Sequence, residues 1–344
     1  MAQLNQLRTS LGLDYSDGRV TAALFSVHPR HVKLVGLNNH VLQPRQQLGG
    51  SPGSSDVFRQ AIRFATSKDR AHHYPKHAVV TLPDAWCYLL TIDLPDRQND
   101  ADTIRREAAQ HLPFMPDELV FDSTVAATEN GVTTVQVAAC PVPVVQNILA
   151  VLDGTGLEAT ELVPAGVAAL RTFAIPPNIR AAIAVFINDT STTVMLVTDR
   201  GIPFSVSTNA LQVHRVIALL TKNLRLSDTE ASEAITVCGL DRTVSHGVVR
   251  KVLENDVVEL ANAIQRVSSF GVSLTAQGAP SVVLLGGSGG ALRNLDVELR
   301  ERCKLEVLLL PIKSELAQMI QALQQPPQAV AASLSALGAG MPRP

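Results

Sequence analysis

The chain repeats one order of secondary-structure elements, and this repeat restricts its fold more than any single motif does. Three consecutive short strands are predicted within 11–37, and a helix and a further strand follow them. Strands predicted within 182–206 are again followed by helices and a strand. A duplicated order of meander, helix and strand predicts an α/β protein of two related lobes that close on a cleft, where ligands commonly bind.

Length, composition and charge exclude several classes of protein. A chain of 344 residues suits two lobes, and 46% hydrophobic residues supply a large core. The net charge of −2 gives no basic field, so nucleic acid is not an expected partner. The apolar runs are too short to cross a bilayer, and the N-terminal segment lacks a signal-peptide core. We therefore expect a cytoplasmic protein without direct membrane insertion, which reaches a membrane only through a partner.

The cysteines are widely spaced, lie among apolar residues and form no CxxC pair. We expect them to be small buried residues in a reducing compartment, and not metal ligands or disulfide partners. They are Cys87, Cys140, Cys238 and Cys303.

The segment 84–163 reads as an insert in the first lobe. Its pattern predicts a strand, a helix, a hairpin turning at Glu129-Asn130-Gly131, a helix and a strand, which is the order of a ferredoxin-like subdomain. The expected domains are a first lobe at 8–83 and 164–180, the insert at 84–163, and a second lobe at 181–340 with a helical subdomain at 217–280.

In the stretch Pro280–Leu292, a predicted buried strand is followed by four glycines and then by the expected start of a helix. A dinucleotide-binding loop is excluded, because its third glycine would be Leu292 or Asn294. The serine of a hydrolase elbow would be Ser288, but all nine histidines precede it, which leaves no base in the usual serine, acid, histidine order. The remaining possibility is the nucleoside loop of an actin-like ATPase, formed by Gly286, Gly287, Ser288 and Gly289.

Three segments resemble one known family. LGLDYSDGRVTAALF at 11–25 looks like the first phosphate hairpin of actin-like ATPases. The segment 104–125 is similar to the more specific signature E-A-x-x-x-[IL]-P-F-x-x-D-E of the PilM family, the actin-like platform proteins of type IV pili, and 156–173 resembles that family's return into the first lobe. The matching residues of the signature are Glu107, Ala108, Leu112, Pro113, Phe114, Asp117 and Glu118. The resemblance covers nearly the whole chain.

The resemblance implies a fold, a cofactor and a partner. The fold would be two actin-like lobes of ribonuclease-H-like type with a ferredoxin-like insert, and ATP with Mg²⁺ would sit between the lobes. Asp14 would help to hold the hydrated metal ion, and Ser16 and the glycine loop would face the nucleotide. The partner would be the short cytoplasmic N-terminus of a bitopic pilus-platform membrane protein, and pilus motor ATPases are further possible partners. The peptide groove would draw on Pro113, Phe114, Asp117 and Glu118.

The chain departs from the family where phosphate chemistry takes place. Ser16 stands at an expected glycine, and Asp17 adds a carboxylate. Phe186, Ile187 and Asn188 occupy an expected Asp-x-Gly, although Asp189 could substitute after a shift in register. Ile235 stands at an expected lysine near the adenosine. The sequence therefore predicts that the residues around the adenosine are retained and that those around the metal and phosphates are partly lost. We expect weak or lost nucleotide binding and no efficient hydrolysis.

Three functions are open at this point. The first is a scaffold that couples cytoplasmic motors to an inner-membrane pilus or secretion platform. The second is an active ATPase of the same fold, against which Ser16, Phe186 and Ile235 count. The third is a small-molecule kinase, for which no acceptor-site base is evident.

Overall fold

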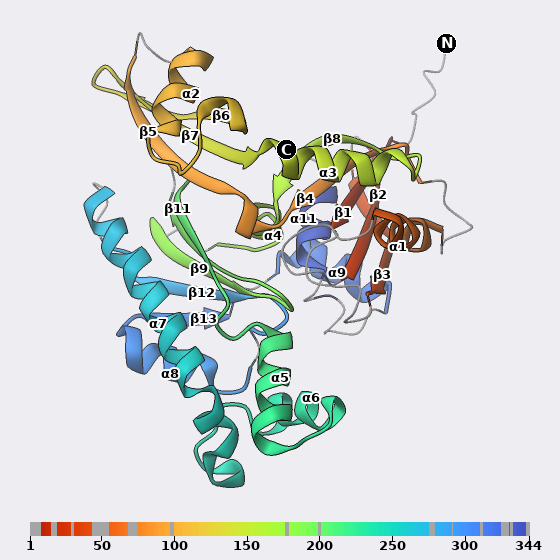
Figure 1. The fold of residues 1–344 in the computed structure, drawn as a ribbon, viewed down its shortest axis with the longest axis vertical. Helices are drawn as coiled ribbons and strands as arrows, with labels where there is room; N and C mark the ends of the chain where they lie inside the picture. Colours follow the sequence, from red (N-terminus) through yellow and green to blue (C-terminus); the bar gives the residue numbers. More distant parts are fainter. Residues whose placement is uncertain are drawn as a thin grey trace. The chain divides into compact units, whose positions relative to one another are not determined.

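The structure is a computed structural model in which the chain forms two compact units (Figure 1). The first unit holds Met1–Trp86, Pro143–Ala174 and Pro311–Pro344, and the second holds Cys87–Val142 and Ile175–Leu310. The described residues are 8–14, 19–28, 31–42, 55–67, 74–96, 100–175, 179–198, 201–274, 279–290, 292–309, 312–324, 330 and 333–341. Each unit is considered by itself.

The first unit contains a five-stranded sheet in the order β3-β2-β1-β4-β8. Its first three strands form the predicted antiparallel meander, and β4 and β8 pair parallel to one another. Apolar residues of these strands are buried, including Leu11, Leu13 and Leu24. Their burial explains why the strands could be predicted from the apolar pattern of the sequence. The strands are β1 (Arg8–Asp14), β2 (Arg19–His28), β3 (His31–Val41), β4 (His77–Leu82) and β8 (Glu158–Pro164).

Small residues let the C-terminal helix α11 (Leu334–Gly340) pack directly on the first strand and on α4 (Ala165–Leu170). A Cβ atom at Gly12 would lie 2.0 Å from the Ala336 carbonyl oxygen, and one at Gly338 would lie 1.7 Å from that of Ala168. Such contacts leave no room for side chains. The described part of this unit also includes the helices α1 (Ser55–Ser67), α3 (Val142–Asp153) and α9 (Ser314–Ala322).

The second unit contains an eight-stranded sheet in the order β13-β12-β9-β10-β11-β5-β7-β6. Its first five strands repeat the arrangement of the first unit, because an antiparallel meander is again extended by two parallel strands beside its first strand. The predicted duplication is confirmed. These strands are β9 (Ala181–Ile187), β10 (Thr192–Thr198), β11 (Gly201–Thr208), β12 (Val282–Gly286) and β13 (Glu306–Leu309).

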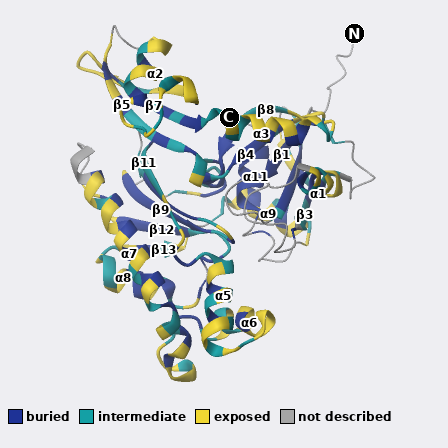
Figure 2. Cartoon of the chain, viewed as in Figure 1, coloured by how far each residue is buried: buried dark blue, intermediate teal, exposed yellow. Residues whose placement is uncertain are grey.

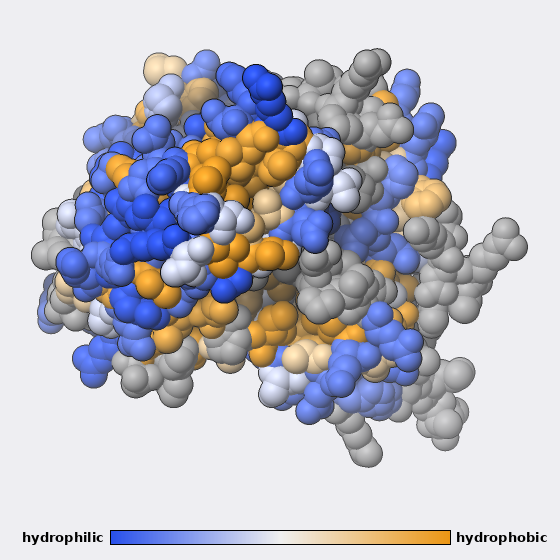
Figure 3. All heavy atoms as spheres, turned by 90° about the horizontal axis from the view of Figure 1, so that it is seen from below, coloured by the Kyte–Doolittle hydropathy of each residue, from blue (hydrophilic) through white to orange (hydrophobic). Residues whose placement is uncertain are grey.

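The core of the second unit joins this sheet to four helices, and Figure 2 shows strands β9 and β12 as largely buried. Alternate residues of β9, namely Ile183, Val185 and Ile187, face that core, as the period of a strand requires. The helices are α5 (Val213–Leu224), α6 (Asp228–Val237), α7 (Val248–Leu274) and α8 (Leu295–Cys303). None of the helices in the described ranges is both long and apolar enough to cross a membrane. Apolar residues form patches among polar ones on the face drawn in Figure 3.

The remaining three strands of this sheet come from the expected insert: β5 (Tyr88–Pro95), β7 (Val132–Pro141) and β6 (Leu119–Glu129). Helix α2 (Ala101–Ala109) covers them, and the hairpin turns at Asn130 and Gly131, whose φ angles of 53° and 78° fit the predicted tight turn. The strand β11 lies beside β5, with Phe204 opposite Leu90.

The two compact units differ from the expected domain boundaries. The last strand of the expected insert, β8, pairs with β4 in the first sheet, so α3 and β8 belong to the first unit. The expected second lobe reached residue 340, but α9 and α11 pack on β2 and β3 of the first unit. These boundaries depend on pairing between strands that are far apart in the sequence. The apolar pattern of a strand does not indicate which strand it pairs with.

Candidate functional site

Asp14 ends β1 in the first unit, and its side chain is only 2% exposed. The parallel register pairs Leu13 with Val80, which brings the next residues, Asp14 and Thr81, to the same end of neighbouring strands. The buried Thr81 Oγ1 donates a hydrogen bond to Asp14 Oδ1. Sequence reasoning missed Thr81, although a polar residue inside an apolar strand beside the acidic one is a usable signal. Ser16, also expected at the nucleotide, lies outside the described residues.

The glycine loop after β12 packs on the turn that follows β9. Gly289 N donates to the Ile187 carbonyl oxygen at 2.8 Å. Gly287 has a φ of 86°, and a Cβ atom there would lie 2.3 Å from the Ile187 oxygen. A Cβ at Gly289 would lie 2.4 Å from Ile187 Cγ2. The chain's own packing therefore requires two of the expected nucleotide-binding glycines.

Ser288, at the tip of the loop, donates a 2.8 Å hydrogen bond from Oγ to Oδ1 of Asp189. Asp189 is 5% exposed, and its carbonyl oxygen accepts from His214 N at the start of α5. Asp189, which could have substituted for the missing acid of the second phosphate hairpin, is thus hydrogen bonded to Ser288, a residue expected to bind the nucleotide.

The helix expected directly after the glycines begins later. α8 starts at Leu295, with Asn294 as its N-cap in the left-handed region at a φ of 62°. Its first turn carries Asp296 and Glu298. We expected the glycine loop to lie at a helix N-terminus and to gain its positive potential. This expectation is wrong, because several turn residues separate the loop from α8.

The positions that depart from the family are filled by apolar packing. Phe186, opposite Gly286 and Thr193 in the sheet, is 1% exposed. Ile235 on α6 packs against the core of the second unit. Neither side chain offers an oxygen or a charge to a phosphate.

The acids expected near the phosphates lie in different units, Asp14 in the first and Asp189 in the second. Asp14 and Asp189 each accept a hydrogen bond from a hydroxyl of the chain, and no group of three His, Cys, Asp or Glu side chains gathers to hold a metal ion in the described ranges. Mg²⁺ prefers an octahedral set of oxygens and usually takes one or two carboxylates. Each unit by itself places one of these two carboxylates, and we derive no catalytic step through the ion.

The expected partner-binding residues form a turn between α2 and β6. Pro113 and Asp117 are exposed, and the half-buried Phe114 ring makes an edge contact with Tyr88 at a centroid distance of 5.7 Å. Glu118 Oε2 accepts from Met115 N at 2.8 Å, so its carboxylate closes the 3-10 turn Pro116–Glu118. Of these four residues, Pro113, Asp117 and Glu118 are therefore exposed, and Phe114 is partly buried against Tyr88.

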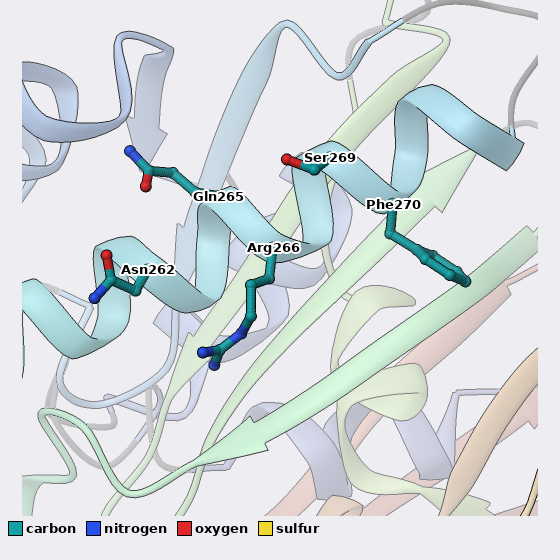
Figure 4. Close-up of a pocket in the computed structure, with 5 residues that line it drawn as sticks. All are labelled: Asn262, Gln265, Arg266, Ser269 and Phe270. Atoms are coloured by element: carbon teal, nitrogen blue, oxygen red, sulfur yellow. The ribbon is translucent and has the colours of Figure 1, made fainter.

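A surface depression of about 660 Å³ lies elsewhere, along α7 (Figure 4). Phe270 packs there on Phe204 at 4.3 Å between ring centroids. The depression is lined by Asn262, Gln265, Arg266, Ser269 and Phe270, and includes none of the expected site residues.

No family model and no curated protein matches the sequence. The structure is similar to a chain of the PilM–PilN type IV pilus biogenesis complex, with a TM-score of 0.74 and 21% identity over 96% of this chain and 97% of that chain. It is also similar to the ethanolamine utilization protein EutJ from Carboxydothermus hydrogenoformans, with a TM-score of 0.57, 14% identity and coverage of 97% and 89%. MreB5 of Spiroplasma citri bound to AMPPNP gives a TM-score of 0.52 and 10% identity, with coverage of 96% and 94%. With the duplicated sheet order, these likenesses show that the chain has the actin-like ATPase fold and resembles PilM in structure.

Proposed function

We propose that the chain is an actin-like scaffold of a type IV pilus or related secretion platform. In this proposal it binds the cytoplasmic N-terminal tail of a bitopic inner-membrane protein, and through that partner it lies at the inner membrane. It hydrolyses ATP inefficiently or not at all, and motor ATPases of the same machinery are further partners.

The likeness to a chain of the PilM–PilN complex carries the proposal, because it extends over nearly the full length of both chains. The signature at 104–125 supports it from the sequence, independently of the fold. Fold alone does not establish function, since related folds serve many activities. The proposal therefore depends on the partner surface, where it can be tested directly.

The turn at 113–118 has the chemistry of a peptide-binding surface. Met115 is 65% exposed, and Asp117 is an exposed acid beside it. An extended peptide with apolar and basic side chains would bury the first and pair with the second. Glu118 contributes by holding the turn, since its carboxylate bonds the Met115 amide.

Binding of a labelled synthetic peptide, the N-terminal tail of the membrane protein encoded beside this chain, tests the proposal by fluorescence anisotropy. M115A should weaken binding by about tenfold, which corresponds to about 1.4 kcal/mol. D117N should weaken it a few fold, and this effect should fade at high salt. E118Q keeps an acceptor for the Met115 amide and should bind nearly normally, whereas E118A opens the turn.

F270A is the control, because Phe270 is also an exposed apolar residue of the same unit and lies on α7, outside the turn at 113–118. F114A serves as a packing probe, since it removes the contact with Tyr88. Unchanged affinity of both M115A and D117N, in variants that melt like the wild type, would place the peptide elsewhere.

The reduced catalytic role is supported by the buried Phe186 and by the hydroxyl partners of Asp14 and Asp189. Phosphoryl transfer depends on placing charge around the phosphates, and these side chains are engaged in packing or in hydrogen bonds. ATP turnover by the purified chain with Mg²⁺ present should be equal to that of a buffer blank or only slightly above it. Turnover in the range of ordinary actin-like ATPases would favour the active enzyme instead.

A further inference from the structure

Cys87 and Cys140 lie opposite one another at the end of the ladder between β5 and β7. The antiparallel register pairs Tyr88 with Ala139, so these two cysteines are the next opposed residues. Neither forms a disulfide, and both are buried, at 9% and 5% exposure. The Cys87 side chain lies near enough to lower the pKa of the Cys140 thiol by hydrogen bonding.

The geometry of such a pair is close to that of a disulfide. Cβ atoms of directly opposed residues in an antiparallel pair lie about 4.5–5.5 Å apart. A disulfide needs them about 3.5–4.5 Å apart. A closure of about 1 Å at the end of a ladder is therefore enough to join the two sulfur atoms.

We propose that Cys87 and Cys140 form a reversible thiol–disulfide site, oxidised by a low-molecular-weight disulfide. The Cys140 thiolate attacks one sulfur of the external disulfide, whose S–S bond breaks and releases one thiolate. Cys87 then loses its proton and attacks the Cys140 sulfur, which forms the Cys87–Cys140 bond and releases the second thiolate. The chain gives up two electrons and two protons, and the external disulfide becomes two thiols.

The other two cysteines show why this pair is distinct. The hydrogen bond from the Cys87 thiol lowers the pKa of Cys140, which favours the attacking thiolate. Burial instead raises the pKa of Cys303 to about 11, and its thiol faces the Ala261 carbonyl oxygen at 4.0 Å. Cys238 caps the end of α6 near the Ser245 hydroxyl.

The position of the pair suggests what the bond does. The chain leaves the first unit after Trp86 and returns to it at Pro143, so the two cysteines flank both connections. The bond would close the segment 88–139, which holds β5, α2, β6 and β7. Closing a long loop restricts its opening, so oxidation should suppress fraying where this segment leaves the sheet.

The test uses the full chain in glutathione redox buffers, followed by acid quenching, alkylation and mass mapping of proteolytic peptides. The expected product joins the peptides of Cys87 and Cys140 within one monomer, and dithiothreitol reverses it. Amide exchange near Tyr88 and Ala139 should become slower in the oxidised form. A C238S/C303S variant should give the same product, and C87A in that background should carry at most a mixed disulfide.

Two results would overturn the proposal. One is a native chain that keeps both thiols in an oxidising buffer in which the same chain, unfolded in urea, forms the bond. The other is a final product with glutathione on Cys140 and no link to Cys87. Mass mapping of the disulfide in the wild-type chain requires no substitution. The test therefore remains valid even if C87A does not fold.

Discussion

Ser288 and Asp189 are joined by a 2.8 Å hydrogen bond across a separation of 99 positions in the sequence. The bond ties the glycine loop after β12 to the turn after β9, and the amide of Gly289 reinforces it through the Ile187 carbonyl. These contacts make the loop a packed element of the second unit. Substitutions in the loop should therefore be visible in stability, independently of any nucleotide.

Gly287→Ala should destabilise the second unit more than a matched change at another glycine. The φ of 86° already costs an alanine about 1–2 kcal/mol, and the added Cβ would meet the Ile187 oxygen at 2.3 Å. The clash should add about 1–3 kcal/mol. Gly131→Ala is the control, because Gly131 has a φ of 78° and open space around it. Equal unfolding free energies in urea for the two variants would contradict the packing role.

Ser288→Ala removes a hydroxyl that donates to a buried carboxylate, and should lower the unfolding free energy by about 1.5–3 kcal/mol. Ser232→Ala is the control, since Ser232 is exposed and bonds only a carbonyl one helical turn away. Denaturation curves without nucleotide should show the difference. Identical curves for the two variants would mean that the Asp189 contact adds nothing to stability.

The sequence was sufficient to predict the duplicated meander, because buried strands such as Ile183–Ile187 carry long apolar runs. It did not predict that β8 pairs with β4, or that β11 lies beside β5, since apolar strands do not encode their distant neighbours. The same limit applied at the site. Both Asp14 with Thr81 and Cys87 with Cys140 depend on register between strands far apart in the sequence.

Gln136→Leu should loosen the join between β11 and β5. The Gln136 side chain accepts from Ile202 N at 2.6 Å and donates to the Ile202 oxygen at 2.7 Å, so it replaces a ladder partner for that residue. Removing it leaves two buried backbone groups of Ile202 without this partner, at a cost of about 1–3 kcal/mol.

Amide exchange at Ile202 is the direct measurement, and it should accelerate in Gln136→Leu. Gln136→Glu can still accept from the Ile202 amide but cannot donate to the Ile202 carbonyl. Exchange at Ile202 in this variant should therefore be faster than in the wild type and slower than in Gln136→Leu. Gln110→Ala, which loses only an exposed bond to Glu107, is the control. Wild-type exchange at Ile202 in Gln136→Leu would show that strand pairing alone holds the join.

Glu298→Gln should give the strongest pH dependence of these variants. Glu298 is 4% exposed on α8 and bonds Arg250 Nε at 2.7 Å and Arg242 Nη2 at 3.0 Å. The hydrogen bond from Arg250 is the main cause that holds the pKa of Glu298 below its usual value. Because the folded-state pKa is depressed, the stabilisation is fully present above about pH 4.3 and is lost as the pH falls through the folded-state pKa.

Near pH 7, Glu298→Gln should therefore cost about 3 kcal/mol, because the arginines lose a buried counter-charge. The gap between wild type and variant should shrink as the pH drops below about 4.3, which unfolding curves at several pH values can follow. Asp296→Asn is the matched control on the same helix, since Asp296 makes only an exposed pair with Arg300 and should change stability by about 0.5 kcal/mol or less. A pH-independent gap for Glu298→Gln would show that packing, and not the carboxylate charge, supplies the stabilisation.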